Sequence, residues 1–221
     1  MAKHLQRELE RLKKRILALG AMVEERVRMA IRAVEMGDRD LADKVIKNDF
    51  EVDEFEVEIE EECLKLLALH QPVAVDLRFL IVVIKLNAEL ERIGDEAVNI
   101  AKCMGYMEGN RDLDFPSDYV PMAEKAESML TKSLDSLVNL DLDLAFRVLT
   151  LDDDVDHMNA AIHEYVKKAI QDDPGHTNAM INFLLIARHL ERIGDHATNI
   201  AEEVIYMIEG EIVRHGRWEA S

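Results

Sequence analysis

The sequence is poor in the residues that make turns and fill large β cores. Its 221 residues include only 9 Gly and 4 Pro, and 5% of them are aromatic. Sandwiches and barrels need frequent turns between short strands, so this composition argues against an all-β fold. A chain of this length can form one or two cores. We therefore expect mostly long helices.

Cysteines and long apolar stretches are also scarce. Cys63 and Cys103 stand forty residues apart, with no second cysteine close to either, which excludes a zinc knuckle or a redox pair and suits a reducing compartment. The longest apolar run, Phe79 to Ile84, has six residues, whereas a span of the bilayer needs roughly 20. The N-terminus has no apolar stretch of the signal-peptide kind. We expect a cytoplasmic protein that does not insert into the membrane.

Basic residues are outnumbered, because 27 Lys and Arg stand against 45 Asp and Glu, a net charge of −18. Such a surface repels the phosphates of nucleic acids and the headgroups of anionic lipids. Nucleic acid is therefore not an expected partner. Metal ions and basic surfaces on other proteins are the natural partners of this charge.

Apolar residues recur at steps of three and four, the period of an amphipathic helix. Gly37 and Asp38 end the first such pattern, Gln71 and Pro72 end the second, and Gly109 ends the third. Proline disfavours helical geometry in the residue before it, and a polar linker follows at 111–116. The helices expected from these signals span about 5–36, 40–71, 73–107, 118–139, 141–171 and 177–209.

One segment occurs twice. Residues 89–101 match residues 189–201 without a gap at ten of thirteen positions, which indicates a duplicated three-helix unit. The sequence predicts an all-α fold of two tandem, pseudo-symmetric three-helix bundles with six long helices. The first unit is assigned to residues 1–110, the second to 116–215, and a C-terminal tail to 216–221.

The repeated segment combines an apolar stripe with two internal glycines. The stripe should lie in the core, and it consists of Leu90, Ile93, Ala97 and Ile100 with Leu190, Ile193, Ala197 and Ile200. Gly94 and Gly194 each cost a helix about 1 kcal/mol relative to Ala, so we expect other elements to approach closely there. The two copies differ where Glu89 and Glu96 become His189 and His196, and we interpret these histidines as exposed, with His196 also considered as a nitrogen ligand.

Each half also carries two pairs of acids with four-residue spacing, which places both members on one helix face. The first set is Asp49, Asp53, Glu91 and Asp95, and the second is Asp152, Asp156, Glu191 and Asp195. An antiparallel turn near Gln71 sets Asp49 level with residue 93 and Asp53 level with residue 89, each about 3 Å along the axis from Glu91 or Asp95. The same test brings the second set together. Carboxylate oxygens suit magnesium, manganese, calcium or iron better than copper or structural zinc.

Two other interpretations of these acids stay open at this point. They can be ordinary solvated charges paired with Arg92 and Arg192, in a metal-free helical scaffold. They can also serve a metal-dependent enzyme, although the sequence has no Gly-rich phosphate loop, no Gly-x-Ser-x-Gly, no His-Glu-x-x-His and no Glu-x-x-His. Asn99 and Asn199 lie two turns beyond the acids and can either extend a site or bond between helices.

The doubled Glu-Arg-Ile-Gly-Asp segments, each with an Asp-x-x-x-Asp pair on the preceding helix, resemble the PhoU family of bacterial phosphate-signalling proteins over nearly the whole chain. The resemblance implies a cytoplasmic, usually dimeric, non-enzymatic negative regulator of the phosphate regulon. Its implied partners are the ATPase subunit of the phosphate ABC transporter and the phosphate sensor histidine kinase. It also implies metal ions, such as iron, manganese, magnesium or zinc, at the eight carboxylates above.

Overall fold

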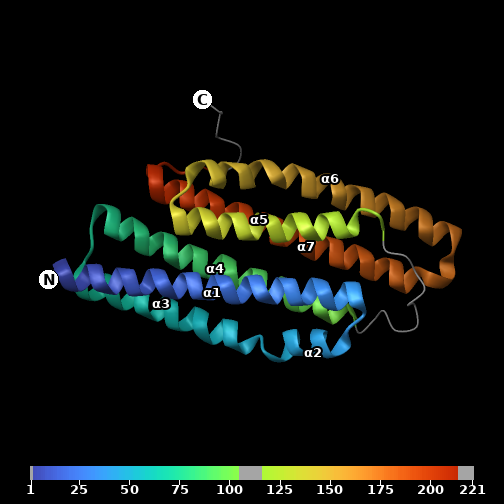
Figure 1. The fold of residues 1–221 in the computed structure, drawn as a ribbon, viewed down its shortest axis with the longest axis horizontal. Helices are drawn as coiled ribbons and strands as arrows, with labels where there is room; N and C mark the ends of the chain where they lie inside the picture. Colours follow the sequence, from blue (N-terminus) through green and yellow to red (C-terminus); the bar gives the residue numbers. More distant parts are fainter. Residues whose placement is uncertain (1, 105–115, 214–221) are drawn as a thin grey trace.

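The computed structural model describes residues 2–104 and 116–213, and this part of the chain contains helices and no strands (Figure 1). The first half consists of α1 (Ala2–Met36), α2 (Arg39–Lys47), α3 (Phe50–His70) and α4 (Ala74–Cys103). The second half consists of α5 (Tyr119–Asn139), α6 (Leu142–Asp172), the short 3-10 helix η2 (Pro174–His176) and α7 (Thr177–Glu209). None of the described helices is long and apolar enough to span a bilayer.

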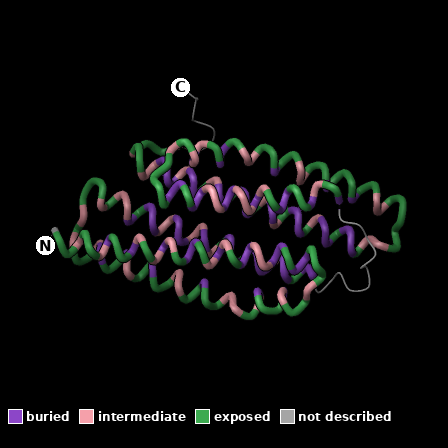
Figure 2. Tube along the Cα trace, viewed as in Figure 1, coloured by how far each residue is buried: buried purple, intermediate pink, exposed green. Residues whose placement is uncertain are grey.

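The two bundles lie side by side and are joined along α4 and α7, which run antiparallel, with α1 also contacting α5 (Figure 1). Buried residues line the inner helices, and the outer sides of α3 and α6 are exposed (Figure 2). All eight predicted stripe residues, from Leu90 to Ile100 and from Leu190 to Ile200, are completely buried. The prediction of two pseudo-symmetric three-helix bundles is therefore confirmed.

The duplication extends to the loop between the first two helices of each half. Gly37 and Leu140 both have a positive φ, 64° and 52°, which ends α1 and α5. The carboxylates of Asp38 and Asp141 then accept the backbone N–H of the residue three positions on, each at 3.0 Å, as N-cap residues do. Equivalent caps therefore begin α2 and α6.

The second predicted helix is divided, unlike its counterpart. Between α2 and α3 the N–H groups of Glu51 and Val52 donate to the carbonyls of Asn48 and Asp49, three residues back, at 3.1 and 2.8 Å. Asn and Asp side chains compete for backbone hydrogen bonds and weaken helices, which explains the interruption. In the second half α6 continues through Leu151 and Asp152. The break places Asp49 at the start of α3.

The repeated glycines differ in how tightly they are packed. A Cβ at Gly94 would lie 3.3 Å from Val52 Cγ1, whereas one at Gly194 would lie 3.6 Å from Met129 and Val155. The close approach expected at the first glycine is confirmed, and the second has ordinary contacts. The predicted helix end at 107, its stop at Gly109, the linker start and the tail 216–221 lie outside the described residues.

Candidate metal centres

The first cluster of acids joins α3 and α4. Burial, followed by the charges of Asp53 and Asp95, raises the pKa of Asp49. Burial and then Asp53 raise the pKa of Asp95, while burial, Asp95 and Asp53 raise that of Glu91. The four carboxylates therefore act on one another across the two helices, as the register argument predicted.

The second cluster joins α6 and α7 in the same way. Burial raises the pKa of Asp195 to about 6, with further contributions from Asp152, Glu191 and Asp156. Burial, followed by the charge of Asp156, also raises the pKa of Asp152. Asp195 has the largest upward pKa shift among the eight carboxylates, and burial contributes more to it than the repulsion from the neighbouring acids.

Lysine and arginine side chains lower the pKa of acids in the first cluster. Lys102 lowers the pKa of both Asp49 and Asp95, helped by Arg26 at the former and by Arg192 at the latter. In the second cluster, His196 acts against the upward pKa shift of Asp195. At the position equivalent to Lys102 the second copy carries Glu202.

The arginines that could have neutralised the acids bind other partners. Arg92 pairs with Glu89 at 2.9 Å, and Arg192 pairs with Glu96 at 2.7 Å. Within residues 2–104 and 116–213, no ion pair joins any of the eight clustered carboxylates to a lysine or arginine. The interpretation of these acids as a salt-bridged surface therefore loses its predicted partners.

Charge alone does not make these clusters metal sites. In the described part of the chain, no three or more His, Cys, Asp or Glu side chains are gathered closely enough to hold a metal ion. The donor set, which consists of carboxylate oxygens, fits hard cations such as magnesium and manganese. Side-chain rotation would have to bring the oxygens together, and metal binding at these eight residues stays a prediction.

The histidines of the second copy have a role that the sequence interpretation missed. His189 Nδ1 lies 2.6 Å from Glu96 Oε2, and His196 Nδ1 lies 2.7 Å from Glu89 Oε2. His196 is 9% exposed, so the expectation that it is an exposed residue is wrong. Helices α4 and α7 run antiparallel about the pseudo-twofold axis. As a result, His189, which stands at the position of Glu89, contacts Glu96, and His196, which stands at the position of Glu96, contacts Glu89.

Glu89 gathers further contacts at this junction. Asn199 Nδ2 donates to its Oε2 at 3.0 Å, so this asparagine bonds between helices and does not extend a carboxylate cluster. Burial alone would raise the pKa of Glu89, but the hydrogen bonds from His196 and Asn199 lower it. The two Glu-to-His differences, seven residues apart in segments that match at ten of thirteen positions, are the sequence signal for this contact.

The comparisons with known proteins agree with this architecture. A sequence profile of the PhoU domain matches residues 16–104 and again residues 120–204. The chain belongs to the PhoU family. Among its relatives, the "phosphate-specific transport system accessory protein PhoU homolog" of Clostridium acetobutylicum is 37% identical over 93% of this chain and 94% of that protein. The accessory protein PhoU of Escherichia coli K12 is 35% identical, over 94% of this chain and 86% of its own length.

Two solved PhoU structures have the same fold. The crystal structure of PhoU from Pseudomonas aeruginosa superposes with a TM-score of 0.87 at 35% identity, covering 93% of this chain and 99% of that one. The phosphate transport system regulatory protein PhoU from Streptococcus pneumoniae gives 0.89 at 29% identity, covering 96% and 100%. The similarity therefore includes both halves of the molecule.

Proposed function

We propose that this PhoU-family chain is a non-enzymatic accessory protein of phosphate-specific transport that acts in the cytoplasm and represses the phosphate-starvation regulon. The observation that carries the proposal is the match of both halves to the PhoU domain, with relatives named as accessory proteins of that transport system. Its partners in this role are the ATPase subunit of the phosphate ABC transporter and the phosphate sensor histidine kinase, and the working form is a homodimer.

Regulation can be tested in cells. In a bacterium lacking its own PhoU-family protein, a reporter driven by a phosphate-starvation promoter should be active even when phosphate is plentiful. Expression of this chain should silence the reporter in rich phosphate and not in poor phosphate. A reporter that stays active in both media, with the chain present at normal levels, would reject the regulatory role. Pull-downs from cells grown with and without phosphate would identify which partner is bound in each state.

Metal binding forms the second part of the proposal. Asp49, Asp53, Glu91 and Asp95 would hold cations in the first half, and Asp152, Asp156, Glu191 and Asp195 in the second. A bound cation would supply positive charge that offsets the mutual repulsion of these acids. The chain's own contribution is to hold four carboxylates on paired helices, so that α3 stays fixed to α4 and α6 to α7.

A metal-dependent enzyme is the competing function, and the residues around the clusters give it little support. Hydrolysis at a metal centre needs a general base or nucleophile beside the ions, and the sequence motifs for such groups are lacking. Elemental analysis and calorimetric titration with manganese would test the binding itself. A protein that neither contains nor takes up metal would leave a metal-free scaffold as the remaining interpretation.

A further inference from the structure

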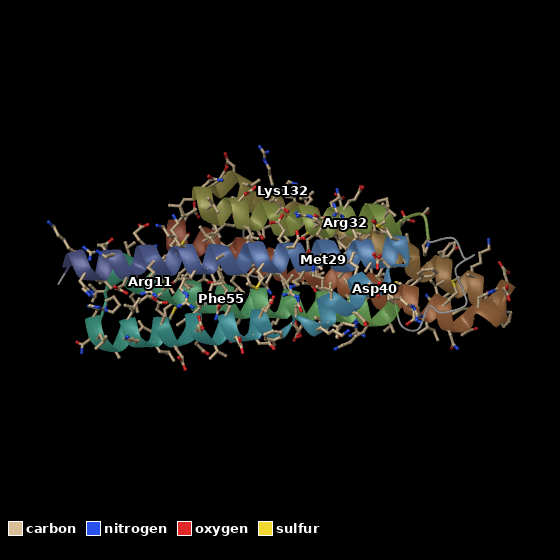
Figure 3. The ribbon with its side chains drawn as sticks, turned by 60° about the horizontal axis from the view of Figure 1, so that its bottom comes forward. Arg11, Met29, Arg32, Asp40, Phe55 and Lys132 are labelled. Carbon is tan, nitrogen blue, oxygen red and sulfur yellow. The ribbon has the colours of Figure 1, made fainter. Side chains whose placement is uncertain are left out.

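Helix α3 lies at one edge of the molecule, where it packs on α1 and α4 through one side (Figure 1). Figure 3 shows this edge, with the labelled Phe55 between α1 and α3, where Arg15 stacks on its ring. The inward side of α3 is fully buried, and its residues are Val52, Ile59, Cys63 and Leu66. The opposite side faces solvent along the length of the helix.

That outer side carries three large apolar residues. Phe50, Val57 and Leu64 are 53%, 50% and 54% exposed. They follow one another at intervals of seven residues, so they fall on one line along the helix, as the residues at one position of a coiled-coil seam do. A repeated apolar line on an exposed helix is a surface suited to another helix.

Acidic residues flank this line, and three of them have no ion pair within the described part of the chain. Glu58 and Glu62 bind Arg15, and Glu51 binds Arg26, so these acids belong to the contact with α1. Glu54, Glu60 and Glu61 have no ion pair with any residue in the described part of the chain. The outer face of α3, defined by Phe50, Val57 and Leu64 with these three glutamates, is therefore apolar in the middle and negative at its margins.

The second half shows that the fold does not require these apolar residues. The buried Val52 and Ile59 correspond to the buried Val155 and Ile162 of α6, an offset of 103. At the same offset the exposed line becomes Asp153, Ala160 and Lys167. A duplicated unit thus folds with polar or small residues at these positions, and the apolar line in α3 serves something other than folding.

We propose that the outer face of α3 is a docking surface for an amphipathic helix of another protein, with an apolar stripe flanked by Lys and Arg. The apolar stripe packs on Phe50, Val57 and Leu64, and the basic flanks pair with Glu54, Glu60 and Glu61. A second copy of this face fits poorly. Antiparallel pairing centred on Val57 sets Glu54 against Glu60 and Asp53 against Glu61, and facing like charges at such seams disfavour association. This inference does not rest on metal binding or on the role in phosphate transport.

The test uses the full chain and a labelled synthetic peptide of three heptads, with leucine at the a and d positions and lysine at e and g. The flanking lysines keep the peptide from pairing with itself. Fluorescence anisotropy should show saturable binding that weakens as salt is added. The double substitution Val57→Gln with Leu64→Gln should weaken binding by roughly tenfold or more, since it removes two apolar contacts.

Matched controls separate docking from loss of fold and from general charge attraction. The variant Val138→Gln with Ile181→Gln changes residues of similar exposure elsewhere, and it should bind like the wild type. The α3 double variant should keep the wild-type thermal midpoint, and a peptide with glutamate at e and g should not bind. Lack of binding, or equal binding by the α3 double variant, overturns the proposal. It is also overturned if sedimentation shows that the α3 substitutions turn a dimer into a monomer, because a second copy then covers this face.

Discussion

The two halves of the molecule hold the same four carboxylates in different electrostatic surroundings. In the first half Lys102, Arg26 and Arg192 offset part of the repulsion. In the second half, burial and then the neighbouring acids raise the pKa of Asp195 to about 6, and His196 acts against the shift. The duplicated fold therefore determines the positions of the acids in both halves. Sequence differences at neighbouring positions determine how strongly nearby side chains offset the negative charge that could attract a cation.

The junction between the halves differs from both clusters, because its acids are paired. Glu96 is 2% exposed and is bound by His189 and Arg192. Glu89 is bound by His196 and Arg92. His189 and His196 occur only in the second copy of the segment, and each gives one acid of the first copy a hydrogen-bonding partner. This contact between the halves therefore depends on a sequence difference between the two copies.

The largest expected effect is at this junction. Glu96→Ala leaves the largely buried His189 and the half-exposed Arg192 without their shared acid, and leaving a buried hydrogen-bonding group without its partner costs about 1 to 3 kcal/mol. Glu89→Ala should cost less, since the Glu89 side chain is 13% exposed against 3% for Glu96 and its pair with Arg92 lies within one helix. Urea unfolding of both variants measures the difference. Equal and small losses, below about 0.5 kcal/mol, would show that these contacts do not hold the halves together.

The next effect concerns the proposed metal sites. Asp95→Ala should weaken metal binding in the first half and leave the second largely intact, and Asp195→Ala should do the reverse, because the clusters lie in separate bundles. Loss of one ligand should weaken its own site by on the order of 10- to 100-fold, the range seen even for outer-shell partners. Calorimetric titration with manganese resolves the two sites.

Thermal melts of the same variants distinguish a ligand set from a salt-bridged surface. With chelator, removal of one acid should stabilise the protein, because it relieves repulsion; with manganese, it should destabilise. A destabilisation of equal size in both conditions would rule out the metal assignment, since the lost acid would then be an ordinary ion-pair partner.

The register of the hairpins was predictable, and the docking of the halves was not. A turn near Gln71 was enough to set Asp49 and Asp53 beside α4. In two antiparallel helices joined by a turn, the numbers of any two residues that face each other add up to the same value. The interruption between α2 and α3 at Asn48 was not predicted. The buried Val45 and Val52 are seven residues apart, so the apolar pattern continues across the interruption as if the helix were unbroken. The His–Glu pairs depend on how α4 meets α7, which follows from packing between bundles and not from the period of either helix.

A smaller effect is expected from pH in the metal-free protein. The pKa of Asp195 is raised in the folded state to about 6, so between about pH 4 and 6 the folded chain holds a proton that the unfolded chain has lost. Stability from this group therefore rises as the pH falls through 6. In chelator at pH 7, Asp195→Asn should stabilise the protein by about 0.2 to 0.5 kcal/mol for each like-charged neighbour relieved.

The gain from Asp195→Asn should disappear at pH 4, where the wild-type carboxyl is protonated. Comparing the two proteins at each pH cancels the histidine titrations that both share. The equivalent Asp95→Asn should show a smaller gain at pH 7, because cations already offset part of the repulsion there. A larger gain from Asp95→Asn than from Asp195→Asn would mean that the first cluster, and not the second, has the stronger repulsion between its acids.

The smallest expected effect comes from changing Lys102, whose positive charge offsets part of the repulsion in the first cluster. Lys102 is exposed and sits at the position equivalent to Glu202, so Lys102→Glu gives the first half the charge of the second without touching a proposed ligand. Removing a cation and adding an anion near Asp49 and Asp95 should tighten manganese binding in the first half by a few-fold, in keeping with exposed charge interactions of about 0.2 to 1 kcal/mol. Added salt should shrink this gain, since both charges are solvated. The second site should keep its affinity. A weaker first site in Lys102→Glu, at low salt, would mean that Lys102 helps to hold the cluster together and that net charge does not set the order of the two halves.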